Sequence, residues 1–123
     1  MGKVAPDDMI DAALEYVQAC NRMFVCKAEP TDYADASATE DLATITLTTP
    51  DDLVIADDTS GRKITIAAKS GETIDHTGDA THIALGLSSD TSLRYVTTCT
   101  TQTLTAGGTV DVPAWKISIS DPT

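Results

Sequence analysis

The clearest strand signal in the chain is Thr81-His82-Ile83-Ala84-Leu85-Gly86-Leu87. Ile83, Leu85 and Leu87 fall at every second position, so an extended backbone places all three on one face. The polar residues 88–92 follow directly and predict a hairpin loop that returns the chain. This stretch therefore predicts an antiparallel β-structure, and the rest of the sequence can be compared with it.

Similar short segments recur on both sides, about every 8–12 residues, with turn residues between them. The candidate strands are residues 23–26, 44–48, 53–55, 63–67, 73–75, 81–87, 93–98, 100–105, 109–112 and 115–119. Residues 28–41 are expected to form a loop, Ser70-Gly71 and residues 77–79 to form turns, and Pro113 to lie at a strand edge or bulge. No pattern for a second helix supplies a crossover, which disfavours parallel strands.

Ahead of the strands, residues 7–21 predict one α-helix, with Asp7 or Asp8 as its N-terminal cap. The apolar stripe of this helix consists of Ile10, Ala13, Leu14, Val17 and Cys20. A helix this short is not stable alone, so the stripe must pack on the sheet of the same chain or on a partner subunit.

The predicted fold class is therefore mainly β: an antiparallel β-sandwich or barrel of about eight short strands, preceded by one N-terminal α-helix. A chain of 123 residues has the length of one domain. We expect residues 1–123 to form a single domain, with the helix over residues 7–21 and the β-sandwich over residues 22–123. Aromatic residues make up only 4% of the chain, so aliphatic side chains must build the core.

The chain carries a net charge of −11, and the acids are concentrated in its first half. Residues 1–60 hold 13 Asp and Glu against Lys3, Arg22 and Lys27. The acidic surface expected from residues 1–60 either keeps the protein soluble or faces a basic partner. Such a balance disfavours binding to nucleic acid and to anionic membranes. Because we find neither a membrane-spanning apolar run nor a signal-peptide core, we expect synthesis in the cytoplasm.

Two histidines invite a metal interpretation, because His76 and His82 lie close in sequence to Asp75 and Asp79. A zinc ion would need three or four such ligands in a tetrahedral array. His76, Asp79 and His82 are weak candidates only, since Gly and Asp at residues 77–79 are typical of a turn and His82 opens a strand. We therefore expect neither a metal nor a cofactor.

Other patterns give still less support for an enzyme. Residues 57–61, Asp-Asp-Thr-Ser-Gly, resemble a fragment of a calcium loop but lack the full spacing and the distal Glu. No nucleophile elbow supports a Ser-His-Asp triad, and no phosphate-binding glycine motif occurs. Cys20, Cys26 and Cys99 are odd in number and are expected to be reduced, buried apolar residues. Tyr95 and Trp115 are expected to pack in the core or on a sheet face.

Several segments in order resemble a family of small virion proteins of tailed bacteriophages and prophages, described as head-decoration, tail-fibre-like or structural proteins. The segments are residues 22–30, 60–65, 78–85, 93–98, 104–110 and 113–119, and the resemblance spans roughly residues 8–122. The segments 78–85 and 104–115, GDATHIAL and LTAGGTVDVPAW, have residue patterns that are common around β-turns in many proteins. The order and spacing of all the segments are more specific to the family. The resemblance implies an all-β structural module that acts through contacts, with no catalytic residue to transfer.

The sequence and the resemblance together predict a non-enzymatic structural protein of the phage particle. The first expectation is a capsid decoration (cement) protein that bridges neighbouring capsid subunits. The alternative is a neck, tail or fibre-associated module, and a small metal-dependent hydrolase is a remote third. The expected partners are the major capsid protein or other virion proteins and further copies of this chain, and the expected location is the virion.

Overall fold

The computed structural model describes residues 7–48, 51–59 and 61–119. Within these residues, helix α1 (Asp7–Gln18) is followed by nine strands that pair in antiparallel sheets. The predicted mainly-β class with one N-terminal helix is confirmed. Of the two architectures predicted, the sandwich fits and the barrel does not, because the sheets do not close on one another.

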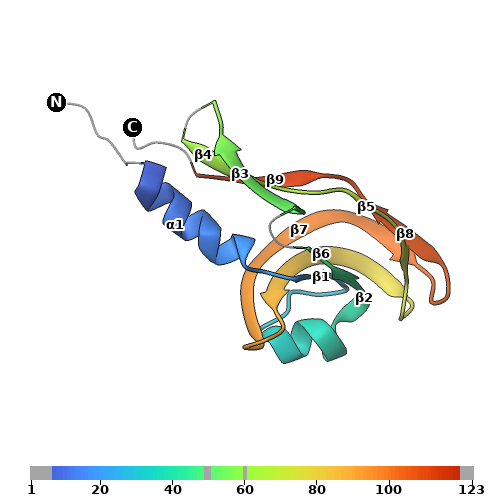
Figure 1. Cartoon of the computed structure of the whole chain (residues 1–123). Helices are drawn as coiled ribbons and strands as arrows, with labels where there is room; N and C mark the ends of the chain where they lie inside the picture. Colours follow the sequence, from blue (N-terminus) through green and yellow to red (C-terminus); the bar gives the residue numbers. More distant parts are fainter. Residues whose placement is uncertain (1–6, 49–50, 60, 120–123) are drawn as a thin grey trace.

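The first layer is a four-stranded antiparallel sheet, curved beneath the other strands in Figure 1. Its order is β2 (Asp41–Thr46), β1 (Arg22–Cys26), β6 (Gly78–Leu87) and β7 (Ser92–Leu104). Strand β1 lies in the middle and is buried on both faces, which explains its unbroken apolar run.

The second layer is built around β4 (Arg62–Ile66), which pairs with β3 (Leu53–Asp57) and with β9 (Trp115–Ile119). A further pair, β5 (Lys69–Thr73) with β8 (Thr109–Val112), continues it. Ile66 of β4 pairs with Trp115 of β9. Lys69, three residues after Ile66, pairs with Val112, three residues before Trp115, so the β5–β8 pair keeps the register of the β4–β9 pair. Pro113 lies at the interruption between β8 and β9, which fits the strand edge or bulge expected for a proline.

The core lies between the two layers and is aliphatic. It includes Met23, Ile45, Leu53, Ile64, Ile66 and Leu85, each with no exposed side-chain surface. A second cluster covers the outer face of the first layer, where Phe24 meets Tyr33 edge-on at 5.3 Å between ring centroids. Tyr33 belongs to the segment after β1, so this segment is what buries the outer face of β1.

Helix α1 packs against β3, β4 and β7, which settles the choice left open by the sequence in favour of its own sheets. Leu14, Val17 and Cys20 are buried as predicted. Ala13, predicted for the same stripe, is exposed, and the side chain of Ile10 lies outside those described. Among the described residues, no helix is long and apolar enough to cross a membrane.

The helix ends at Gln18 rather than at residue 21, because Asn21 already belongs to the first layer. The Asn21 N–H donates to the Gly86 carbonyl at 3.1 Å, and the Asn21 carbonyl accepts from the Leu47 N–H at 2.9 Å. These sheet-type bonds compete with a further helical turn and end the helix before Asn21.

Four predicted elements were wrong in detail. The strand expected over residues 73–75 is not formed, because β5 ends at Thr73. Ser70-Gly71 is no turn but part of β5, where Gly71 has a φ of 68° at a shift in register. Residues 93–98 and 100–105 are not two strands, because a single β7 runs through Cys99. The loop expected over residues 28–41 contains a short π-helix, η1 (Asp35–Thr39), and its last residue opens β2.

The turn predicted at residues 77–79 is also shorter than expected, because Gly78 already begins β6. A Cβ at position 78 would lie 3.0 Å from Cδ2 of Leu42, which belongs to β2. Glycine is therefore favoured at position 78 because the Leu42 side chain packs closely against the backbone there, and not because the chain turns.

Candidate functional site

The weak metal candidates lie at separate places and bind other groups. Nδ1 of His76 lies 3.0 Å from the backbone carbonyl of Asp41, and Nδ1 of His82 lies 2.8 Å from the hydroxyl of Thr81. A carboxylate oxygen of Asp79 accepts a hydrogen bond from Thr103 at 2.9 Å. In the described part of the chain, no three or more His, Cys, Asp and Glu side chains gather to hold a metal ion.

The calcium-like segment at residues 57–61 also uses its carboxylates internally. Asp58 accepts hydrogen bonds from the Ser118 hydroxyl at 2.7 Å and from the Thr59 N–H at 2.9 Å, with Nζ of Lys116 at 3.3 Å. Hydrogen bonding lowers the pKa of Asp58 to about 2. The bond from the Ser118 hydroxyl has the largest effect, and the bond from the Thr59 N–H the next largest. Asp57 turns instead to Arg62, at 2.7 Å. Each carboxylate thus binds protein donors rather than facing the other.

Several acids of the first half pair with cations of the second half. Asp11 binds Arg62, and Lys69 binds Asp52 at 2.7 Å. The hydrogen bond from Lys69, with that from the Thr48 N–H, lowers the pKa of Asp52. Part of the acidic excess therefore joins α1 and the segment before β3 to the second layer, which leaves fewer acids for a basic partner.

One acid is buried. Asp41, at the start of β2, has 5% of its surface exposed and accepts a hydrogen bond from the Thr44 hydroxyl at 3.1 Å. Burial raises the pKa of this carboxyl, against the opposing effects of Thr44 and of His76. Asp41 and His76 form one small polar cluster at the end of the first layer, where the Asp75 and His76 N–H groups also donate to the Leu42 carbonyl.

Among the described residues the three cysteines form no disulfide bond, and two of them are buried like apolar residues. Cys20 and Cys26 have no exposed surface, and burial raises their pKa to about 11 and about 12. Cys99 is half-buried, and burial raises its pKa less strongly. The prediction of buried cysteines thus fits two of the three.

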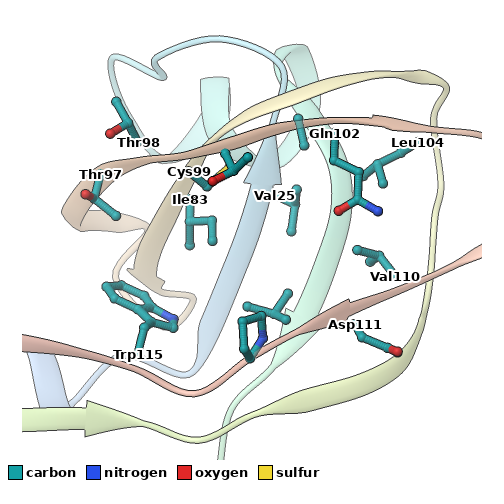
Figure 2. Close-up of a pocket in the computed structure, with 14 residues that line it drawn as sticks. Val25, Ile83, Thr97, Thr98, Cys99, Gln102, Leu104, Val110, Asp111 and Trp115 are labelled. Atoms are coloured by element: carbon teal, nitrogen blue, oxygen red, sulfur yellow. The ribbon is translucent and has the colours of Figure 1, made fainter.

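One hollow in the described part of the chain lies between the two layers, where the first ends at β7 and the second at β8 and β9. Its volume is about 450 Å³, within the range of about 300–1,000 Å³ that is usual for binding pockets. Figure 2 shows Ile83 and Val25 on one side of it and Trp115 on the other. Asp111 is the one charged residue in its lining, and this side chain lies at an exposed position.

Trp115, the single tryptophan of the chain, is part of this hollow. Its ring lies 6.0 Å from that of Tyr95, between centroids, so the two aromatic residues join β9 to β7 across the space between the layers. Nε1 of Trp115 is buried and has no hydrogen-bond acceptor among the described residues. An indole N–H usually finds a partner when it is buried, so the hollow contains one unused donor.

Strand β7 forms the rim of the hollow and is the outermost strand of the first layer. It pairs with β6, and its other edge meets no strand in the described part of the chain. Residues 95–104 carry no charge and no proline. Between Thr98 and Gln102 this strand holds extra residues relative to β6, a bulge that leaves part of its backbone outside the ladder.

The sequence did not single out this hollow. Its lining comes from strands that are distant in the chain, and Trp115 gave only the expectation of core or sheet-face packing. The one local signal was the uncharged, threonine-rich run over residues 95–104. No protein-family model, no curated protein and no solved structure matches this chain.

Proposed function

We propose that this chain is a non-enzymatic structural protein of tailed-bacteriophage particles that decorates the capsid and bridges neighbouring capsid subunits. The observation that carries the proposal is the open edge of the sandwich, where an uncharged strand borders an apolar hollow. Such an edge suits contact with protein, whereas the candidate catalytic and metal-binding side chains are dispersed. The ordered resemblance to virion proteins supplies the choice of assembly.

The mechanism is geometric. A module that binds only the assembled shell stabilises that shell by mass action. Repetition over a lattice multiplies individually weak contacts into strong retention. A compact two-layer sandwich with one apolar edge and an acidic remainder can fill a seam between subunits, with its charged faces left in solvent.

The deciding experiment measures the copy number of this chain in purified particles, by mass spectrometry against labelled reference peptides. We expect a copy number that matches the capsid lattice. A copy number typical of a single ring would favour the neck or tail module instead. Absence from particles, with the chain free in the host cytoplasm, would overturn the virion proposal.

A second measurement tests the nature of the contact. At about 1 M salt the Debye length falls to about 3 Å, which weakens contacts made by exposed charges. We expect retention on sedimented particles to be unchanged between low and high salt, because the proposed contact is apolar. Release at high salt would show that the acidic surface makes the contact.

A further inference from the structure

A groove separate from the hollow runs between α1 and the outer edge of β3, two elements that Figure 1 shows at the same end of the molecule. Its volume is about 510 Å³, and α1 lines one side of it with Asp11, Glu15 and Gln18. These residues are four and three positions apart, so they share one face of the helix. Because β3 and β9 are the opposite edges of their sheet, the groove lies away from the hollow.

The edge of β3 that faces this groove is open. The Ala67 N–H donates to the Asp52 carbonyl, so Asp52 faces β4, and the direction of the backbone groups alternates from there along the antiparallel ladder. Leu53 and Ile55 therefore direct their N–H and C=O groups away from β4. Gln18 donates to the Leu53 carbonyl at 2.9 Å, whereas the backbone groups of Ile55 bond to no described residue. This edge can accept a further strand.

The groove also contains acids that lack a cation partner. Three carboxylates and one guanidinium group line it, so the lining has a net charge of −2. Asp11 is bound to Arg62, as described above. Glu15 and Asp51 are exposed, and neither carboxylate forms an ion pair with any residue that the structure describes.

The charge of the groove decides which occupant fits it. A second copy of this chain does not, because its net charge is −11 and four of its cations are already paired with acids: Arg62, Lys69, Arg94 and Lys116. A segment that carries lysine or arginine is attracted by the unpaired carboxylates. In extended conformation, the same segment matches the open edge of β3 with its backbone groups.

We propose that the groove between α1 and β3 binds an extended, basic segment of another protein, which adds to β3 as a further strand. Ile55 exchanges backbone hydrogen bonds with the segment, and cations of the segment meet Glu15 and Asp51. Val54, which is 51% exposed, offers apolar surface that the added strand covers. This inference goes beyond the proposed function, since it concerns another edge of the molecule and another kind of contact.

The probe is a heptapeptide of alternating lysine and threonine, blocked at both ends, because alternation places all the lysines on one face of a strand. It is titrated into the purified chain, and the backbone amide signals are followed by NMR. We expect saturable shifts centred on β3 and on the side of α1 that faces it. We also expect the Ile55 N–H to exchange more slowly with solvent in the complex, because it then donates to the peptide.

Two matched peptides separate charge from strand addition. Glutamate in place of lysine reverses the charge but leaves the strand intact, whereas proline in place of threonine keeps the lysines and removes alternate N–H groups. We expect neither peptide to slow the exchange of the Ile55 N–H. Equal binding of the lysine–threonine and lysine–proline peptides would show that charge alone holds them, and would refute the proposal.

Neutralising the groove tests the contacts with cations. We expect Glu15→Gln and Asp51→Asn each to raise the dissociation constant of the lysine–threonine peptide about twofold to fivefold, the range that exposed ion pairs support. Glu29→Gln is the matched control, because Glu29 is exposed on the segment after β1 and does not line the groove. We expect this variant to bind as wild type does, and circular dichroism checks that all three variants fold.

Three further results would overturn the proposal. The first is no binding of the lysine–threonine peptide up to its solubility limit, and the second is a set of shifts that lies away from β3 and α1. The third is an equal loss of affinity in Glu29→Gln, which would mean that net charge alone attracts the peptide. None of these measurements uses phage particles, so the failure of this inference and the failure of the virion proposal are distinguishable.

Discussion

The two carboxylate oxygens of Asp11 accept hydrogen bonds from Nε and Nη2 of Arg62, at 2.8 and 3.1 Å. A third bond, from Nη1 of Arg62 to Asp57, measures 2.7 Å. One guanidinium group thus joins α1 to β4 and to the end of β3. Such two-pronged pairing is the strongest geometry available to an arginine and a carboxylate.

We expect Asp11→Asn to lower the midpoint of thermal unfolding, because the amide keeps one acceptor oxygen but loses the charge. Glu15→Gln makes the same charge change one turn later on α1, at an exposed position, and should leave the midpoint unchanged. The difference between the two variants should shrink as salt is added. Equal midpoints at low salt would mean that the Asp11–Arg62 pair contributes nothing to stability.

Leu14 tests how α1 is held. Its side chain is 1% exposed, so Leu14→Asp should destabilise the protein by more than the about 2–5 kcal/mol that deletion to alanine usually costs. Ala13 is exposed beside it, and Ala13→Asp should cost no more than about 0.7 kcal/mol, the usual helix-propensity range. Urea denaturation measures both. A wild-type midpoint for Leu14→Asp would contradict the docking of α1 on the sheets.

Acid should destabilise the protein through Asp58. Its pKa is about 2 in the folded state and 3.8 in the reference state, so the unfolded chain binds the proton more readily. The stabilising effect of this carboxylate is thus present above about pH 4 and is lost as the pH falls towards 2. We expect Asp58→Asn to unfold more easily at pH 5 but to lose less stability between pH 5 and pH 2.

Asp51→Asn is the matched control for this titration, because Asp51 is exposed and undergoes the same charge change. It should reproduce the wild-type dependence on pH. If Asp58→Asn lost more stability than wild type between pH 5 and pH 2, Asp58 would not be a source of the acid destabilisation.

Asp41 has the opposite effect on the pH dependence of stability. Because its pKa is raised in the folded state, folding favours the protonated carboxyl, and this contribution to stability falls as the pH rises through that pKa.

The thiols should react at different rates. We expect a thiol reagent at pH 8 and low protein concentration to label one cysteine of the native protein quickly, and the other two only after unfolding. Cys99 is the half-buried one, whereas Cys20 and Cys26 are fully buried and have pKa values raised to about 11 and about 12. Peptide mapping of the labelled site should identify Cys99, and fast labelling at Cys26 would contradict the closed outer cluster.

Local patterns predicted most of the strands correctly, because alternation depends only on neighbouring residues. They failed where one residue type fits two structures. Gly71 suits both a turn and a bulge inside a strand, and only pairing with β8 decides between them. The N–H of Gly71 donates to the carboxylate of Asp111 at 2.7 Å, a bond between residues far apart in the sequence.

The order of the strands and the hollow could not be predicted from such patterns. Trp115 faces a hollow because the first layer ends at β7 and the second at β9, which is a property of the whole topology. Likewise, the acids of the first half were counted as one surface, whereas Asp11 and Asp52 each pair with a cation of the second half. Charge counts describe the chain, and pairing decides which charges remain exposed.

The order of the strands also constrains how the protein is made on the ribosome. Strand β1 lies at the centre of its layer but pairs with residues 82–86 of β6, so this pairing cannot begin before residue 82 has been synthesised. Likewise, β4 cannot pair with β9 before residue 115 has been synthesised. The first half therefore leaves the exit tunnel with apolar strands that have no complete sheet to join. Residues 1–60 carry 13 acids against three bases, and charge of one sign opposes the association of such incomplete chains on neighbouring ribosomes. We therefore expect the acidic excess to oppose the association of nascent chains during the interval before the central strands pair.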